Sequence, residues 1–150
     1  MTTTTRVLGV DACRAGWVGV VWDGDRATPL AARDIGSLVA AADLGGRVPV
    51  VAIDIPIGLP DSGRRQADVL AKREIGRLRS SVFMTPVRPA FEADDHPSAV
   101  AINRALAGEG VSIQAFGLRA KVLEVERFVR STACGDRRVL EVHPEVCFAR

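Results

Sequence analysis

The fold is decided by residues 7–33, which read VLGVDACRAGWVGVVWDGDRATPLAAR. Val7–Asp11 and Trp17–Trp22 are short runs rich in β-branched and aromatic residues, and such runs predict strands. Asp23-Gly24 follows the second run directly, and this dipeptide is a strong hairpin signal. A third strand is therefore expected over Arg26–Arg33. Together the three segments predict an antiparallel meander.

A helix and a fourth strand are expected to follow the meander. Ile35–Leu44 is rich in alanine and precedes Gly45-Gly46, a pattern typical of a helix with a glycine stop. Val48–Ile55 is apolar almost throughout, as expected for a strand covered on both faces. A right-handed crossover through the helix would make this strand parallel to the first one.

The second half of the chain predicts mostly helices, punctuated by prolines and glycines. The expected elements are a loop at Pro56–Pro60, a helix from Asp61 or Ser62 to about Ser80, an irregular stretch Ser81–Phe91, a short helix from Pro97 to Gly108, a longer helix from Ser112 to about Arg130, a turn at Cys134–Asp136 and a last strand Arg138–His143.

The size and composition of the chain indicate one globular domain over residues 1–150. No apolar run approaches the roughly 20 residues that a membrane span needs. Met1–Arg6 has no apolar leader segment, so a cytoplasmic protein is expected. Cys13, Cys134 and Cys147 are odd in number and widely spaced, which favours reduced thiols over disulfides or a zinc site.

Carboxylates lie at three of the predicted strands. Asp11 ends the first strand, Asp54 lies at the end of the fourth, and Glu141 is in the last, with His143 two residues on and therefore on the same face. Ligands of open α/β sheets bind beyond the carboxyl ends of parallel strands. Close carboxylates repel unless a cation intervenes, and an all-oxygen cluster suits Mg²⁺ or Mn²⁺. The alternative is that each acid has a structural role, in a turn or a surface ion pair.

Two further groups are candidates for substrate binding. Only two of the 20 basic residues are lysines, and arginine binds phosphate through paired hydrogen bonds. The predicted phosphate-binding group comprises Arg64, Arg65, Arg79 and the Ser80-Ser81 turn. The second group shares one helical face at spacings of three and four and comprises Gln114, Gly117, Lys121 and Glu124. The alternatives are a solvated basic helix face for the first group and a Lys121–Glu124 surface ion pair for the second.

Four motifs in this order carry a family resemblance: VDACRAGW at 10–17, DIPIGLP at 54–60, RSSVF at 79–83 and EVHPE at 141–145. From about Arg6 to Phe148 the chain resembles the family called domain of unknown function 429. Members of that family are regarded as predicted nucleases of the RNase H-like superfamily.

The resemblance implies an RNase H-like α/β fold. In this fold a mixed sheet begins with an antiparallel three-stranded meander, the fourth and fifth strands run parallel to the first, and helices cover both faces. Family members usually continue for several tens of residues past the His-Pro-Glu motif, and RNase H-like enzymes generally take another acid from a helix there. This chain stops at Arg150. The C-terminal helix is therefore expected to be missing. Two outcomes are expected: a homodimer that buries the uncovered side of the last strand, or a chain that is a fragment of a longer protein.

By motif position, the resemblance implies roles for individual residues. Asp11 and Asp54 are similar to the metal-binding acids of the first and fourth strands. Glu141, His143 and Glu145 match the motif on the last strand, with Glu141 and Glu145 as further metal ligands and His143 as a catalytic residue. The motif that precedes the last strand is matched by Gln114, Lys121 and Glu124.

The expected function is therefore metal-dependent hydrolysis of phosphodiester bonds in nucleic acid, with Mg²⁺ or Mn²⁺. One alternative is a catalytically inactive RNase H-like binding or scaffold module. A second alternative is a phosphotransferase of the actin and sugar-kinase type. That class needs a Gly/Thr-rich phosphate loop after the first strand, and Ala12–Ala15 is a poor match to such a loop.

Overall fold

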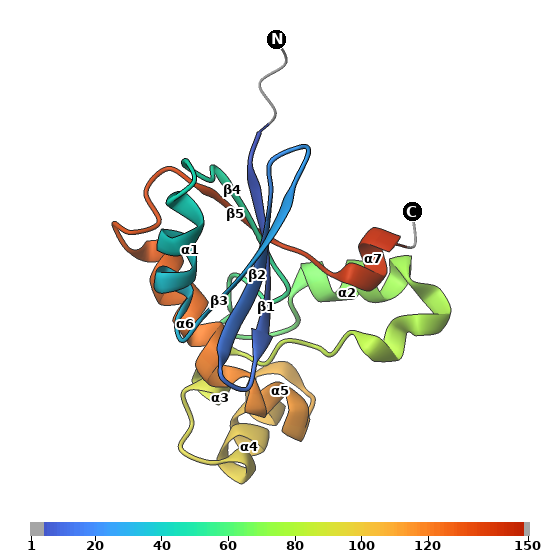
Figure 1. The fold of residues 1–150 in the computed structure, drawn as a ribbon. Coiled ribbons are helices and arrows are strands. Elements are labelled where there is room, and N and C mark those ends of the chain that lie inside the picture. The colour runs from blue at the N-terminus through green and yellow to red at the C-terminus, as the bar shows by residue number, and fades with distance from the viewer. Residues whose placement is uncertain (1–4, 149–150) are drawn as a thin grey trace. The chain divides into compact units, whose positions relative to one another are not determined.

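The computed structural model describes residues 5–148, which divide into two compact units (Figure 1). The first unit comprises the chain up to Ile57 together with Glu124–Val142. The second unit comprises Gly58–Leu123 together with the residues from His143 on. Most of Met1–Arg6, the segment expected to contain no leader, lies outside the described residues. No described helix is long and apolar enough to cross a membrane.

The first unit is built on a mixed five-stranded sheet with the strand order β3-β2-β1-β4-β5. The strands are β1 Val7–Cys13, β2 Gly16–Trp22, β3 Ala27–Ala32, β4 Val50–Ile53 and β5 Arg138–Glu141. β2 pairs antiparallel with both β1 and β3, whereas β4 pairs parallel with both β1 and β5. The predicted meander and the parallel fourth and fifth strands are confirmed, although β4 and β5 are both shorter than expected.

The predicted hairpin turn between β2 and β3 is confirmed in detail. Asp23 Oδ1 accepts hydrogen bonds from the backbone N–H groups of Asp25 (3.2 Å) and Arg26 (2.9 Å). These two donors, that of Arg26 first, lower the pKa of the Asp23 carboxyl below its usual value. Gly24 takes a φ of 105°, a conformation that favours glycine. The turn chemistry therefore agrees with the dipeptide signal.

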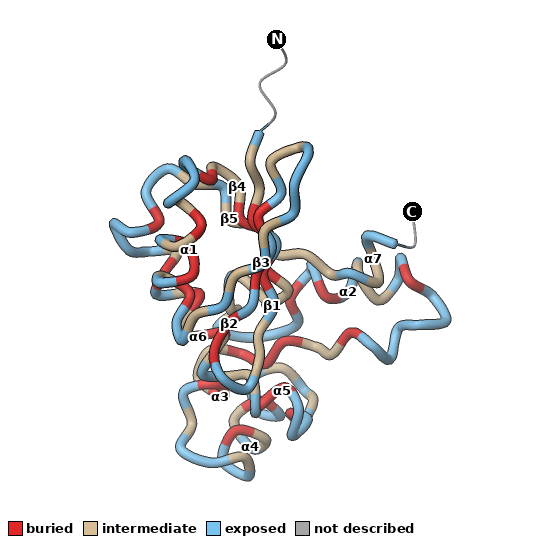
Figure 2. Tube along the Cα trace, in the orientation of Figure 1, coloured by how far each residue is buried: buried red, intermediate tan, exposed pale blue. Residues whose placement is uncertain are grey.

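One face of the sheet forms the core of the first unit. Successive side chains of a strand alternate between the faces, and Leu8, Val10, Trp17 and Val21 are all buried on this one. α1 (Ile35–Asp43) packs closely against it, because a Cβ atom at Gly19 would lie 3.2 Å from Leu38 Cδ2. The buried stretches of α1 and the strands are visible in Figure 2.

The glutamate at position 124 joins three elements of the first unit. Glu124 lies in α6 (Arg119–Arg130), whose second half belongs to this unit. Its Oε1 accepts one hydrogen bond from Trp17 Nε1 of β2 at 2.8 Å. The same oxygen accepts a second from the backbone N–H of Ile35, the first residue of α1, at 2.7 Å. α6 therefore lies on the same face of the sheet as α1.

The opposite face of the sheet keeps large apolar side chains exposed, among them Val18, Val20 and Trp22 of β2. The expectation of helices on both faces is therefore not met by the helices of the first unit. The chain between β4 and β5 does not form a single crossover helix, because most of it builds the second unit.

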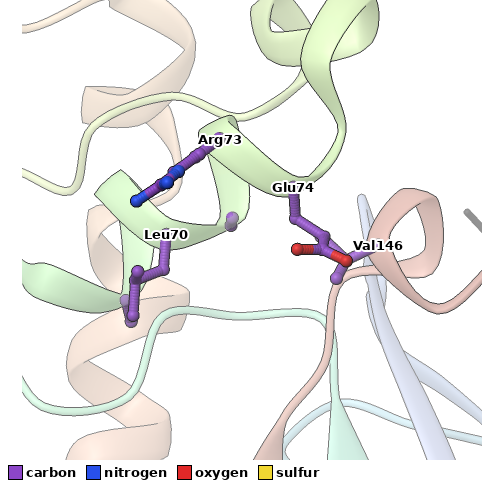
Figure 3. Close-up of a pocket in the computed structure, with 6 residues that line it drawn as sticks. Leu70, Arg73, Glu74 and Val146 are labelled. Atoms are coloured by element: carbon purple, nitrogen blue, oxygen red, sulfur yellow. The ribbon is translucent and has the colours of Figure 1, made fainter. Parts of the chain in front are cut away.

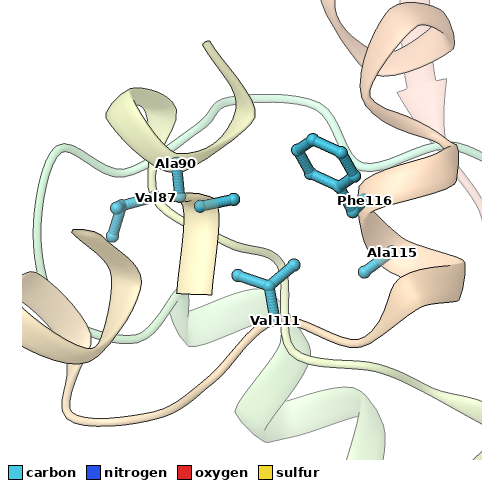
Figure 4. Close-up of a cluster of buried hydrophobic side chains, with 6 residues drawn as sticks. Val87, Ala90, Val111, Ala115 and Phe116 are labelled. Atoms are coloured by element: carbon cyan, nitrogen blue, oxygen red, sulfur yellow. The ribbon is translucent and has the colours of Figure 1, made fainter. Parts of the chain in front are cut away.

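The second unit consists of short helices. They are α2 Gln66–Glu74, the 3₁₀ helix η1 Gly76–Ser81, α3 Arg88–Phe91, α4 His96–Ala107, α5 Ile113–Gly117, the first half of α6 and α7 Pro144–Phe148. Their apolar core is shown in Figure 4 and comprises Val87, Ala90, Ala99, Val111, Ala115 and Phe116.

Among the helices of the second unit, α4 has the boundaries that agree best with those expected from the sequence. Asp95 precedes the helix, and its carboxylate accepts a hydrogen bond from the Ser98 N–H at 2.8 Å. Pro97 lies in the first turn, and Gly108 ends the helix with a φ of 76°. The expected start and stop are therefore confirmed to within one residue.

The other helical predictions were partly wrong. The helix expected up to Ser80 is interrupted after Glu74, where α2 ends, and Gly76, with a φ of 51°, begins η1. The helix expected from Ser112 to Arg130 is broken at Leu118 into α5 and α6, although Ser112 does cap its start by accepting from the Ala115 N–H. α3 lies within the stretch expected to be irregular.

A short helix also follows the last strand, where none was predicted. α7 begins at Pro144, whose fixed φ suits the first turn of a helix. It belongs to the second unit.

Replacing Glu124 tests whether its carboxylate holds the first unit together. Glu124→Ala leaves the Trp17 indole and the Ile35 amide without their acceptor, so we expect a loss of about 1–3 kcal/mol in the free energy of unfolding. Glu124→Gln, which retains an acceptor oxygen, should lose less. Urea unfolding followed by tryptophan fluorescence measures both. Arg127→Ala, at an exposed position of the same helix, is the control and should change stability by less than about 0.5 kcal/mol. Equal effects of the Ala variants at 124 and 127 would contradict the assignment.

Candidate functional site

The carboxylates of Asp11 and Asp54 come from neighbouring parallel strands of the first unit. Val10 of β1 pairs with Ile53 of β4, and the Asp54 N–H donates to the Val10 carbonyl at 3.1 Å. Each aspartate directly follows one member of this pair. Their Cα atoms are therefore expected to lie about 5 Å apart, the spacing of adjacent strands.

Both aspartates can be reached from solvent. Asp11 is exposed and lies opposite Val18 of β2, and its Oδ1 accepts a hydrogen bond from the Ala12 N–H at 2.7 Å. Asp54 is half-buried in the bend after β4. Two carboxylates so close repel each other, and a shared cation would relieve that repulsion.

Glu141 is held differently. It pairs with Ile53 in the β4–β5 ladder, so strand alternation places it on the same face as Ile53 and Val10, opposite to Asp11. Its Oε2 accepts a hydrogen bond from the Ile57 N–H at 2.9 Å, which holds the loop after β4. The structure thus brings Asp11 and Asp54 together, and it directs Glu141 to the other face. Within residues 5–148, no group of three His, Cys, Asp or Glu residues is arranged to hold a metal ion.

His143 and Glu145, the other two candidate site residues of the EVHPE motif, belong to the second unit. His143 Nδ1 lies 3.8 Å from Glu145 Oε2, a separation too long for a hydrogen bond. The His143 carbonyl accepts from the Cys147 N–H at 3.0 Å and so closes the turn of α7. His143 therefore directly precedes α7 and Glu145 lies within it.

The predicted polar helix face is divided by the break at Leu118. Gln114 and Gly117 are exposed on α5, whereas Lys121 is half-buried on α6. Glu124, expected on the same face, instead accepts the two hydrogen bonds described above. A helical spacing read from sequence assumes one continuous helix, and the break removes that assumption.

The predicted phosphate-binding residues have three different environments in the second unit. Arg64 is exposed and forms a two-pronged ion pair with Glu109, with N–O distances of 3.1 and 3.3 Å. Arg79 and Ser80 are exposed on η1. Arg65 is buried. Only the exposed positions are accessible to a ligand in this conformation.

Arg65 belongs to a buried network that the sequence did not reveal. Its Nη2 lies 2.7 Å from Asp68 Oδ1, and the second oxygen of Asp68 accepts from the Thr85 N–H at 2.8 Å. Arg65 is 8 % exposed and Asp68 is 2 % exposed. The spacing of three residues between Arg65 and Asp68 could have indicated the ion pair. The contact between Asp68 and Thr85 depends on the tertiary fold and could not be read from sequence. The network ties the start of α2 to the segment before α3.

A pocket of about 550 Å³ lies between α2 and α7 in the second unit. Figure 3 shows Arg73 and Glu74 on α2 and Val146 on α7 at its wall. The full lining is Ala67, Leu70, Ala71, Arg73, Glu74 and Val146. The pocket contains none of the predicted site residues, and its one basic side chain, Arg73, is a candidate for contact with an anion.

Removing the Asp68 carboxylate should destabilise the second unit. Asp68→Ala removes the carboxylate that faces the buried Arg65 guanidinium and accepts from the Thr85 N–H, and removing one partner of a buried ion pair costs about 3–5 kcal/mol. The exposed pair provides the matched control, because Glu109→Ala should cost about 1 kcal/mol or less. Thermal and urea unfolding of both variants measure the difference. A similar small loss for both would show that the buried network contributes little.

No curated protein and no solved structure matches this chain. The model of one family, described as "Protein of unknown function (DUF429)", matches residues 9–150, which is nearly the whole chain. That span includes all four motifs that carried the resemblance. The chain therefore belongs to the DUF429 family.

Proposed function

We propose that this protein hydrolyses phosphodiester bonds of nucleic acid in a reaction that depends on a divalent metal ion. The observation that carries the proposal is the position of Asp11 and Asp54, adjacent at the carboxyl ends of β1 and β4. Ligands of α/β sheets bind at such strand ends.

Two carboxylates fit the coordination chemistry of magnesium. Mg²⁺ usually keeps several waters and binds through one or two carboxylates together with phosphates of the substrate. One carboxylate oxygen of Asp11 accepts a hydrogen bond from the Ala12 N–H. A carboxylate has two acceptor oxygens, so the second can still act as an acceptor. When bound, the metal would lower the pKa of a water molecule and stabilise charge on a phosphodiester. The two aspartates would hold the ion, and the N–H of Ala12 would orient the Asp11 carboxylate.

Exposed basic residues support nucleic acid as the substrate class. Arg77 and Arg79 are exposed on η1, as is Arg73 on α2. Guanidinium groups bind phosphates through paired hydrogen bonds, and contacts of this kind supply most of the non-specific affinity for nucleic acid. Hydrolysis by an RNase H-like enzyme is proposed here from the family motifs together with the acid pair.

A non-catalytic binding module is the second candidate. The observation that favours it is the orientation of Glu141, which is engaged by the Ile57 amide on the face opposite to Asp11. A phosphotransferase has less support, because β1 and β2 are joined by a tight turn at Arg14-Ala15. Such a turn offers no glycine-rich cradle for phosphates.

Hydrolysis assays distinguish these functions. Purified protein with Mg²⁺ or Mn²⁺ should cleave at least one of single-stranded, duplex, hybrid and junction substrates. Asp11→Asn and Asp54→Asn should each lower the rate by about 10²–10³-fold, as for the loss of one electrostatic stabiliser. Asp25→Asn, at an exposed position in the β2–β3 hairpin, is the control and should retain the rate. Absence of cleavage by the wild type, or cleavage unchanged in Asp11→Asn, would refute the nuclease proposal.

Binding measurements test the basic residues separately from catalysis. If η1 contacts phosphates, the affinity for a labelled oligonucleotide should fall with salt, and Arg79→Ala should reduce the slope of log K against log salt by about 1. Fluorescence anisotropy in EDTA gives these constants without cleavage. Arg127→Ala serves as the control. A dissociation constant independent of salt would show that η1 is an ordinary solvated surface.

A further inference from the structure

The sheet of the first unit has one face, here called the outer face, whose side chains point away from α1. Its exposed apolar residues are Val18 (40 %), Val20 (45 %), Trp22 (45 %) and Leu140 (39 %). Ala27, Pro29 and Ala31 of β3 are exposed in the same register. The outer face therefore crosses the whole sheet, from β3 to β5.

The composition of the outer face differs from that of a solvated face. Strands with one face in water normally alternate apolar residues toward the core and polar residues toward the solvent. β2 instead presents Val18, Val20 and Trp22 outward and Trp17 and Val21 inward, so it is apolar on both sides. Large contiguous apolar patches of this kind mark interaction sites.

The chemistry of the outer face selects a protein partner. Its central row is formed by Pro29, Val20, Gly9, Ala52 and Leu140, which pair across the sheet and carry no charge. A nucleic acid would need cations along the surface that it follows. The charged residues of the outer face lie outside the central row: Asp11 and the neighbouring Asp54 beyond one side of it, and Arg138 beyond the other. An apolar centre with charges toward the rim is the usual arrangement of a protein interface.

Asp11 and Arg138 are arranged symmetrically about Ala52. Ala52 pairs with Gly9 of β1 and with Leu140 of β5. Asp11 lies two residues after Gly9, and Arg138 lies two residues before Leu140. Ala52 is therefore midway between two opposite charges that face the same side. A two-fold axis over Ala52 would exchange the two positions, so a second copy would place its Arg138 at Asp11 and its Asp11 at Arg138.

We propose that the outer face binds a second copy of this chain, with its apolar centre packed against itself and two reciprocal Arg138–Asp11 ion pairs between the copies. The ion pairs set the register, and burial of Val18, Val20, Trp22 and Leu140 supplies the affinity. This inference does not depend on hydrolysis. The two proposals share Asp11, however, so a divalent cation bound there would compete with Arg138 of the second copy and weaken the dimer.

Sedimentation velocity in EDTA tests the proposal without that competition. The wild type should form a dimer, and Val20→Asp, which places a charge in the apolar centre, should be monomeric. Arg138→Asp should weaken association about tenfold or more, because it sets two like charges against each other. The double variant Asp11→Arg with Arg138→Asp should restore association, since it reverses both partners. Arg127→Asp, at an exposed position of α6, should leave the dimer unchanged.

Loss of folding and loss of association can be distinguished in these variants. Circular dichroism and thermal unfolding verify that each variant is folded, and if Val20→Asp fails to fold, the charge-reversal pair still decides. A monomeric wild type, a dimer unaffected by Val20→Asp, or a double variant that associates no better than Arg138→Asp would overturn the proposal. Association that continues beyond a dimer would exclude the two-fold arrangement.

Discussion

Parallel hydrogen bonding between β1 and β4 determines which side chains meet in the first unit. The pairing of Val10 with Ile53 places Asp11 next to Asp54. The same ladder pairs Gly9 with Ala52 and thereby aligns the outer face. A shift by one residue would exchange the two faces of β4 and separate every one of these groups from its neighbour. Val51 and Ile53, which are buried on β4, oppose such a shift, since it would turn them to the exposed face.

Elements governed by local chemistry could be predicted from the sequence. The meander followed from the Asp23-Gly24 turn and its flanking β-rich runs, and α4 followed from Pro97 and Gly108. The parallel fourth strand followed from the handedness of crossovers. In each case the deciding residues are adjacent along the chain or obey a general rule of connection.

The candidate site was less predictable because it depends on register and tertiary contact. Asp11 and Asp54 could be paired from sequence, because both directly follow an apolar strand. Glu141 also lies at a strand end, but its position opposite Ile53 turns it to the other face. Arg65 was predicted to bind phosphate, yet it is buried in the structure and paired with Asp68, whose second oxygen accepts from the Thr85 amide. Sequence spacing alone does not show whether a charged side chain points into the unit or away from it.

Glutamate 124 shows how one residue can satisfy a motif and the fold together. It matched the family's helix motif, and in the structure it accepts hydrogen bonds from Trp17 and from the first amide of α1. A carboxylate at a helix N-terminus is favoured by the helix dipole as well as by the hydrogen bond. The motif in which it occurs therefore has a structural explanation at this position, independent of any substrate.

Paramagnetic broadening by Mn²⁺ is the most direct test of the proposed cation site at Asp11 and Asp54. In a two-dimensional amide NMR spectrum, substoichiometric Mn²⁺ should broaden the resonances around Asp11 and Asp54 before all others. Asp11→Asn should abolish the effect at both segments, because the two carboxylates share the ion. The exposed hairpin around Asp25 should stay sharp. Broadening that is uniform over the acidic surface, or that persists around Asp54 in Asp11→Asn, would contradict a shared site.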